Sequence, residues 1–449
     1  MTGECGLIRP VKTLHFAAKI LCLTCFLGAG LYAADSSVGP SKADVDAVYP
    51  KMQALYLDLH RNPELSGHEE KTAVKIADHL RQLGYEVTTG FGGNGVVGVL
   101  KNGNGPTVMI RAELDALPVE EKTGLEYASQ VKTKNEKGVE VGVMHACGHD
   151  LHMAIGMGTA ALLAQHKDRW HGTFIYVGQP AEETVKGAVA MLKAGLYTQF
   201  PKPDYALAVH DAANLPAGKV SYVSGFALAN SDAVEVTIFG RGGHGSAPQI
   251  AVDPIVIAAR TILAWQTLVS RENSPFDPAV VTVGSIHAGT RSNIIPDEVH
   301  LQITVRSYKD EVRQHLIDGI GRIAKAEAAA AGAEKPPLVE VVETVKAVYN
   351  DPQLTERTVS ALKKALGDSN VVLSAPAMAA DDFAEYRTDG VPCFDFWVGA
   401  INPQKLEAAQ KSGHEVGGLH SSYFAPDIEP SLKTGITAET VAVLELLGK

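Results

Sequence analysis

Three short apolar segments, each followed by ionisable side chains, constrain the fold of this 449-residue chain most. They are residues 107–111 (TVMIR), 172–178 (GTFIYVG) and 205–209 (YALAV). Apolar runs of this length with almost no charge are typical of strands buried on both faces of a sheet. The carboxyl ends of parallel strands meet at one edge, so the ionisable residues that follow would lie together. The sequence therefore predicts an α/β catalytic domain with its active site along that edge.

The other periodic segments predict a catalytic domain that is interrupted by a second, smaller one. In the catalytic domain, helices are expected on both sides of a turn at 62–64 and at 151–165, 352–366 and 431–447, and strands at 86–89, 95–100 and 393–398. Residues 233–345 follow the order β-α-β-β-α-β, with strands at 233–239, 279–286, 298–305 and 338–345 and helices at 252–269 and 309–331.

We therefore expect a mixed central sheet and an inserted α+β, ferredoxin-like domain, with a four-stranded antiparallel sheet and two helices on one face. The expected boundaries are 1–34 for a signal peptide, 35–228 and 347–449 for the two parts of the catalytic domain, and 229–346 for the inserted domain.

Residues 144–154 (MHACGHDLHMA) concentrate side chains that can bind metal ions: His145, Cys147, His149, Asp150 and His152. Thiolate, imidazole and carboxylate groups bind borderline-soft divalent metals such as zinc. The alternative is a polar loop before a helix with incidental histidines. Further candidates are Glu183, His210 and His420. Taken singly, each could be a helix cap, a strand-end histidine or a loop histidine. All of them fall where one sheet edge would bring them together, which favours a metal site.

The first 34 residues have the layout of a secretory signal peptide. Basic residues precede an uncharged apolar run at 20–32, and small residues follow before Asp35. The run is too short for a comfortable membrane span, although an uncleaved N-terminal anchor is the alternative. No other segment is long and apolar enough to span a membrane. We therefore expect an exported protein, periplasmic or secreted, with no membrane association after cleavage.

Cysteine usage and net charge argue against two classes of protein, disulfide-stabilised scaffolds and nucleic-acid-binding proteins. Only Cys147 and Cys393 lie beyond the leader, so the chain is not a disulfide scaffold. The formal net charge of −11 argues against nucleic acid as a partner.

Ordered motifs along nearly the whole chain resemble peptidase family M20. They include HRNPELS (60–66), RAELDALPVEE (111–121), HACGHD (145–150), QPAEE (179–183), GRGGHGSAP (240–248), SNIIPD (292–297), ADDF (380–383) and LHSSYF (419–424). The chain is most similar to the branch of N-acyl-amino-acid amidohydrolases, hippurate hydrolases and plant auxin-conjugate hydrolases.

The resemblance implies two divalent metal ions, which could be zinc, manganese or cobalt. It implies that Cys147, Glu183 and His420 hold one metal, that Cys147, His149 and His210 hold the other, and that Asp115 orients a ligand histidine. Glu182 would be the general base that takes a proton from the metal-activated water. Asp381 and Asp382 replace a more usual glutamate–aspartate pair, and the resemblance assigns them no role here.

The inserted domain resembles the family's lid and dimerisation domain. It implies that His244 stabilises the oxyanion, across the subunits of a homodimer in related proteins, and that Asn293 and Arg306 hold the substrate's carboxylate or carbonyl group. Arg306 could instead make only a surface ion pair.

The expected activity is hydrolysis of small N-acyl amino acids, such as hippurate-like compounds. A metallo-dipeptidase or carboxypeptidase with the same site is the alternative. A binding protein built on an inactive hydrolase would lack a ligand or the base, and here all are present.

Overall fold

The computed structural model describes residues 39–135, 137–413 and 416–448. The expected signal peptide at 1–34 lies outside the described residues. Within the described part of the chain, no helix has the length and hydropathy needed to cross a membrane.

The catalytic part begins with two helices that meet at the predicted turn. α1 (Lys42–Arg61) starts at a capping box in which Ser41 and Asp44 satisfy each other's backbone amides. α2 (Glu70–Gln82) follows the turn after Asn62. Both helices bury their apolar faces in the main hydrophobic core. The first predicted helical pair is confirmed.

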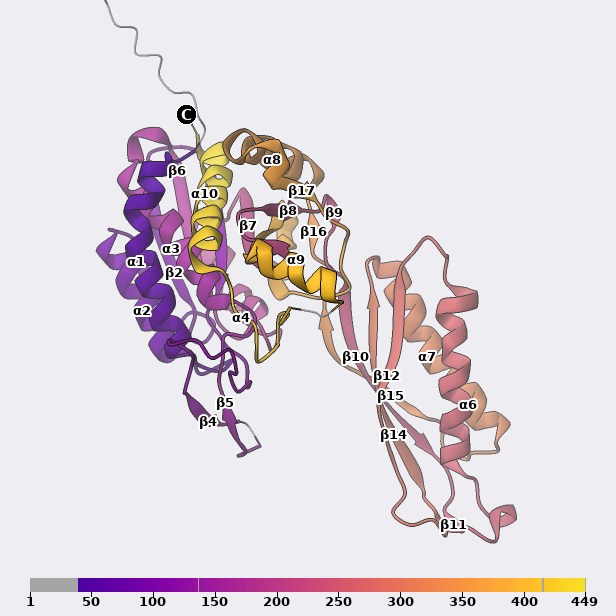
Figure 1. Ribbon diagram of the computed structural model, residues 1–449. Coiled ribbons are helices and arrows are strands. Elements are labelled where there is room, and N and C mark those ends of the chain that lie inside the picture. The colour runs from indigo at the N-terminus through magenta and orange to yellow at the C-terminus, as the bar shows by residue number, and fades with distance from the viewer. Residues whose placement is uncertain (1–38, 136, 414–415, 449) are drawn as a thin grey trace, which may run out of the picture. The chain divides into compact units, whose positions relative to one another are not determined.

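An eight-stranded mixed sheet forms the centre of this part (Figure 1), in the order β1-β2-β6-β3-β7-β18-β8-β17. Its strands are β1 (Glu86–Thr89), β2 (Val96–Asn102), β3 (Thr107–Glu113), β6 (Gly172–Gln179), β7 (Tyr205–Pro216), β8 (Val220–Tyr222), β17 (Val371–Leu373) and β18 (Cys393–Ile401). β6, β3, β7 and β18 are mutually parallel. The three apolar segments thus do lie side by side with their carboxyl ends at one edge.

Helices cover both faces of the sheet. α1, α2, α3 (His149–Gln165), α8 (Pro352–Leu366) and α10 (Ile428–Leu447) share one core with one face. α4 (Gly187–Lys193), α5 (Leu196–Gln199) and the 3₁₀ segment Asp382–Gly390 pack on the other face. α9 (Pro403–Ser412) lies in the connection that follows β18. The central sheet is therefore closed from water on both sides, as the uncharged strands predicted.

A second sheet is built from β10 (Asn230–Phe239), β12 (Ala279–Ala288), β14 (Glu298–Ser307) and β15 (Leu338–Val345). All its pairs are antiparallel, in the order β12-β14-β10-β15. α6 (Pro254–Thr267) and α7 (Asp310–Ala330) share one core with it and lie on the same side (Figure 1). This is the predicted β-α-β-β-α-β arrangement. Its role as a lid and the boundaries 229–346 remain predictions.

Three short two-stranded sheets accompany these larger sheets. β9 (Gly225–Phe226) pairs with β16 (Tyr349–Asn350), so the segments that enter and leave the four-stranded sheet lie next to each other. β11 (Gly243–His244) pairs with β13 (Ile294–Ile295). β4 (Lys132–Lys134) and β5 (Glu140–Gly142) form a third pair.

One predicted boundary is wrong in a way that affects the site. The strand expected at 205–209 continues to Pro216, so His210 lies inside β7 and not just beyond its end. Backbone pairing with β18 extends through this region, where Trp397 is opposite His210. Pairing with β18 therefore extends β7 beyond the apolar residues 205–209 from which the strand was predicted.

Candidate metal centre

The backbone at Gly148 lies close to β7, which places the segment from Cys147 to His149 at the carboxyl edge of the sheet. Gly148 precedes α3 with φ of +76°, a conformation that side chains disfavour. A Cβ at this position would lie 2.4 Å from Oδ1 of Asp211 on β7. Only glycine therefore allows this turn to approach β7, and the approach brings Cys147 and His149 beside His210.

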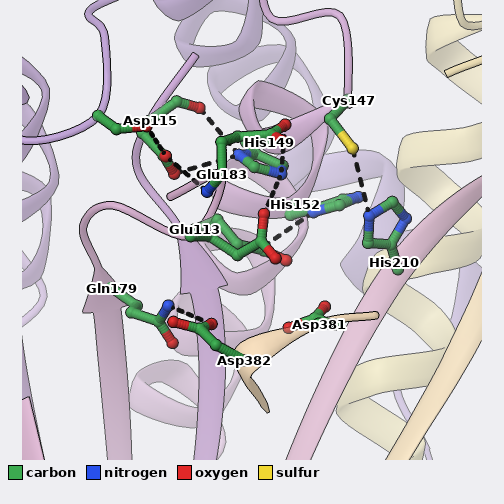
Figure 2. Close-up of polar contacts among 12 residues, drawn as sticks. Glu113, Asp115, Cys147, His149, His152, Gln179, Glu183, His210, Asp381 and Asp382 are labelled. Carbon is green, nitrogen blue, oxygen red and sulfur yellow. Dashed lines mark hydrogen bonds and ion pairs between the residues drawn. The ribbon is translucent and has the colours of Figure 1, made fainter. Parts of the chain in front are cut away.

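The thiol of Cys147 lies at the centre of this group. Its Sγ is 3.2 Å from Nε2 of His420 and 3.6 Å from Nε2 of His210. Nε2 of His420 is also 3.5 Å from Oε1 of Glu183. One ligand atom each from Cys147, Glu183 and His420 lies within 4.8 Å of the others. Figure 2 shows the sulfur atom turned toward the His210 ring.

Hydrogen bonds fix the orientation of the two other histidines that were predicted as ligands. Nδ1 of His149 donates to the backbone carbonyl of Asp115 at 2.8 Å. Nδ1 of His210 donates to the carbonyl of Asp211, also at 2.8 Å. In the neutral ring, each of these bonds selects the tautomer whose Nε2 faces the centre as the nitrogen that could bind a metal ion.

Asp115 supports two of these groups. Its Oδ2 accepts from the Ser66 hydroxyl at 2.6 Å and from the backbone N–H of Glu183 at 3.0 Å. Its Oδ1 is 3.5 Å from Nδ1 of His149. The carboxylate thus connects the histidine on α3 to the segment that carries the glutamate pair (Figure 2).

The chemistry of these atoms fits a divalent metal ion. Nε2 of His149 and Oε1 of Glu183 are buried without a hydrogen-bond partner among the described residues. Unpartnered buried polar atoms are costly, and a cation would satisfy both. Burial raises the pKa of the Cys147 thiol well above its ordinary value, so a thiolate here requires a cation beside it. Sulfur, imidazole and carboxylate donors together suit zinc and similar ions.

Two histidines of the dense segment have other surroundings. His152 lies 2.9 Å from Oε2 of Glu113 through Nδ1 and 3.0 Å from Oδ1 of Asp211 through Nε2. Burial opposes protonation of this ring, but the two carboxylates outweigh it and raise the pKa of His152 to about 9. Both nitrogens of His145 are buried without a partner, and burial lowers the pKa of this ring to about 4. A nitrogen of His152 nevertheless lies within 4.8 Å of ligand atoms of Glu113, His149 and His210, so this ring borders the candidate centre while both its nitrogens contact carboxylates.

The glutamate pair sits in a strained turn after β6. Ala181 and Val185, on either side of the pair, have φ of 54° and 49°. Positive φ is unfavourable for a side chain that is branched at Cβ, and such strain persists only where the surroundings enforce it. Glu182 is buried, with an oxygen 3.8 Å from Nε2 of His149. Burial, with the nearby charges of Asp381 and Asp382, raises the pKa of Glu182 well above its ordinary range.

A buried arginine network below this turn escaped the sequence analysis. The guanidinium group of Arg111, on β3, donates to Gln179 at 3.1 Å, to Asp381 at 2.6 and 3.2 Å, and to Asp382 at 3.0 Å. It also donates to Glu113. The available signal was a charged residue in an otherwise apolar strand, which is rarely buried without partners. The network gives Asp381 and Asp382 a position directly beside Glu182.

The residues predicted in the inserted domain are not part of this cluster. His244 is exposed on β11, and its Nδ1 lies 2.7 Å from the Ser246 hydroxyl. The backbone carbonyl of Asn293 accepts from Gly245 at 2.8 Å, which places Asn293 next to His244. Arg306 is half-buried on β14 and donates to Thr304 at 3.2 Å. The polar contacts described for these three residues all lie within the four-stranded domain, so their substrate roles remain predictions.

A thiolate–imidazole–carboxylate cluster with a free glutamate, at the carboxyl edge of a mixed α/β sheet, defines a metal-dependent hydrolase. Residues 109–415 match the peptidase family M20/M25/M40. Thermostable carboxypeptidase 2 of Saccharolobus solfataricus is 35% identical over 413 residues, which cover 91% of this chain and 98% of the relative. Hippurate hydrolase of Campylobacter jejuni is 37% identical over 349 residues, covering 77% of this chain and 86% of the relative.

Among solved structures, the YXEP protein of Bacillus subtilis is described as a dinuclear metal-binding peptidase of family M20. It is 29% identical with a TM-score of 0.72, and the match covers 89% of this chain and 99% of that one. The chain belongs to peptidase family M20/M25/M40, as its motifs predicted, and it is a hydrolase that acts on amide bonds.

Proposed function

We propose that this protein hydrolyses the amide bond between an acyl group and the nitrogen of an amino acid that keeps a free carboxylate. The observation that carries the proposal is the position of Glu182, a buried carboxylate within 3.8 Å of His149 and beside the Cys147–Glu183–His420 group. The similarity to a relative that is named hippurate hydrolase supports this substrate class.

Cys147, Glu183 and His420 would hold one divalent metal, and Cys147, His149 and His210 a second. When bound, such ions polarise a carbonyl group and lower the pKa of water. The carboxylate of Glu182 accepts a proton from the attacking water and then delivers it to the leaving nitrogen. The raised pKa of Glu182 suits both transfers, because a very weak base would not take the proton. Asp115 holds His149 and the glutamate segment in place throughout.

A carboxypeptidase or dipeptidase activity is the second candidate. It is favoured by the similarity to two thermostable carboxypeptidases of Saccharolobus solfataricus, each 35% identical over 413 residues. The two activities share one site and differ in whether the group on the amide carbonyl carries a free amine. A matched panel of N-acyl amino acids and dipeptides, assayed with zinc-, manganese- or cobalt-loaded protein, separates them.

The mechanism is tested with Glu182→Gln, which keeps the shape of the side chain but cannot accept the proton. We expect turnover of N-acyl amino acids to fall by roughly 10²–10⁴-fold while the bound metal stays at the wild-type level. Glu126→Gln, at an exposed position, is the matched control and should keep full activity. Unchanged turnover in Glu182→Gln would show that another group is the base.

Export and a homodimeric state belong to the same proposal. Export is supported by the leader-like sequence at 1–34 alone. The homodimer would allow His244 to reach the active site of a second subunit. Activity that stays constant per subunit on dilution, while sedimentation shows dissociation to monomers, would contradict that arrangement.

A further inference from the structure

A buried ion cluster lies at the last turn of α1, and the proposed reaction does not use it. Nδ1 of His60 is 2.6 Å from Oδ2 of Asp150, and Nε2 is 3.2 Å from Oε2 of Glu121. All three side chains are at most 1% exposed. Burial opposes protonation of the ring, but its hydrogen bonds to Asp150 and Glu121 outweigh this effect and raise the pKa of His60 to about 10. The ring is therefore an imidazolium that donates to a carboxylate on each side.

The first carboxylate fixes the start of α3, which carries a candidate metal ligand. Asp150 directly follows His149 and is the second residue of the helix. Both of its oxygens are engaged, because Oδ1 accepts from the N–H of Leu151 at 2.9 Å while Oδ2 faces His60. Cys147 lies only two residues before the helix begins. The bond to His60 therefore limits how far the turn from Cys147 to His149 can move.

The second carboxylate leads to the segment of another candidate ligand, His420. Glu121 also accepts from the N–H of Ser129, at 2.6 Å. The next residue, Lys122, donates its backbone N–H to the carbonyl of Ser422 at 2.7 Å. The side chain of His420 is 57% exposed and its φ is +64°, so neither packing nor a relaxed backbone holds it in place. Its position depends on anchors such as the bond between Lys122 and Ser422.

One further bond joins the segment of His420 to the cysteine turn. The N–H of His420 donates to the carbonyl of Ala146, the neighbour of Cys147, at 2.7 Å. A single hydrogen bond leaves a segment free to pivot about it. The second bond, between Lys122 and Ser422, removes that freedom and so fixes the direction in which the imidazole points.

We propose that His60 is a positioning residue that fixes the ligands on the two sides of the centre relative to each other. In the arrangement proposed above, His149 would bind one metal ion and His420 the other, with the thiolate shared. The bond to Asp150 acts on the first side and the bond to Glu121 on the second. Because the thiolate is shared, loss of either bond should weaken the binding of both ions. This role rests on the proposed metal-dependent function.

A purely structural role is the alternative, because the ring of His60 also contacts the rings of Tyr56 and Tyr127, with centroid distances of 5.6 and 5.2 Å. Removing the partner of two buried carboxylates also destabilises the fold. The two roles differ in one measurable quantity, the affinity of the folded protein for metal ions. A structural role predicts lower stability with unchanged affinity, whereas a positioning role predicts weaker binding by chains that are folded.

Two variants separate the two bonds. In His60→Asn the amide nitrogen takes the place of Nδ1 and keeps the bond to Asp150, whereas in His60→Gln it takes the place of Nε2 and keeps the bond to Glu121. The matched control is Tyr85→Phe, which removes a buried hydrogen bond of 2.9 Å from the Tyr85 hydroxyl to the carbonyl of Ala160. This bond belongs to the same helix, α3, but lies farther along it than the ligands.

The metal-free full chain, prepared with a chelator and confirmed as folded by circular dichroism, is titrated with zinc and with cobalt against a chromogenic chelator. We expect the Kd of both ions to rise by roughly tenfold or more in each His60 variant, as is typical when residues that orient metal ligands are removed. Tyr85→Phe should keep its Kd within about twofold of the wild type, because it leaves these residues intact. At equal, subsaturating cobalt, the near-ultraviolet absorption of the cobalt–thiolate bond should be weaker in the His60 variants than in the control.

Wild-type Kd values in both folded His60 variants would overturn the proposal, and so would an equal rise in Tyr85→Phe. If neither His60 variant folds, Glu121→Gln decides, because it keeps the shape of the side chain and leaves the pair of His60 and Asp150 intact. A raised Kd in Glu121→Gln supports the proposal, and an unchanged Kd overturns it. A wild-type chain that binds neither metal would overturn it together with the proposed function, whereas metal binding without hydrolysis of any amide would refute the amidohydrolase function alone.

Discussion

Removal of the buried guanidinium group of Arg111 should be among the most destabilising single changes in the catalytic part. The side chain is 1% exposed and is bonded to three carboxylates, those of Glu113, Asp381 and Asp382. Arg111→Met keeps much of the apolar volume but leaves these charges uncompensated in the interior. Breaking a buried ion pair in this way costs about 3–5 kcal/mol. Because several carboxylates lose their partner together, we expect a loss at or above the upper end of that range.

The assay is urea unfolding followed by tryptophan fluorescence, with Arg313→Met as the matched control. Arg313 makes a similar two-point contact with Asp232, at 2.7 and 2.5 Å, but its side chain is 22% exposed. Solvent reaches the guanidinium group of Arg313, although the carboxylate of Asp232 is buried, and only this one carboxylate loses its partner. The control should therefore lose clearly less than Arg111→Met, but more than a fully exposed pair would. A loss for Arg111→Met no larger than for Arg313→Met would refute the view that burial gives this network its strength. The deficit of Arg111→Met should shrink at low pH, where protonation neutralises the carboxylates.

Three further predictions concern the centre and its surroundings. Cys147→Ser should reduce the bound metal measured by atomic emission, and retention of both metals with full activity would refute a shared thiolate. Gly148→Ala should abolish metal binding because its Cβ would lie 2.4 Å from the Asp211 carboxylate, whereas Gly103→Ala, with a similar φ of +80° but open space, should cost only the backbone strain of about 1–3 kcal/mol. Burial raises the pKa of Asp382 from 3.8 to about 7. Protonated Asp382 therefore stabilises the folded state fully below about pH 4, and this stabilisation is lost as the pH rises through about 7. Asp382→Asn should flatten the dependence of the unfolding free energy on pH over this range, measured by urea unfolding.

Most helices and strands could be predicted from the sequence, because the patterns that indicate them involve residues close together in the chain. Uncharged strands, capping residues and alternating segments depend on neighbours in the chain, and the predicted helix 352–366 and strand 338–345 match α8 and β15. α9 was missed although Asn402, Pro403 and Gly413 supply a cap, a first-turn proline and a left-handed C-terminal glycine. The small apolar content of this helix gave no periodic pattern to support those signals.

The candidate site also contains residues that local sequence patterns reveal and contacts that they cannot reveal. Cys147 and His149 could be found because they are close in sequence, and the glutamate pair because it follows a buried strand. The bonds between Arg111 and Asp381–Asp382 connect positions about 270 residues apart, which no local pattern reveals. The contacts of His152 with Glu113 and Asp211 come from two different strands, so the sequence could not show that both its nitrogens face carboxylates beside His149 and His210.

The sheet order has a consequence for how this enzyme is made. β18 lies between β7 and β8, yet the whole four-stranded domain is synthesised between β8 and β18. A nascent chain that ends before β18 therefore lacks one central strand, and the edges of β7 and β8 that β18 would cover can pair with other chains. His420 follows β18 in the chain, so the candidate metal centre can be completed only after the central sheet has received its last strand. The period before β18 emerges is when the chain most needs protection from aggregation.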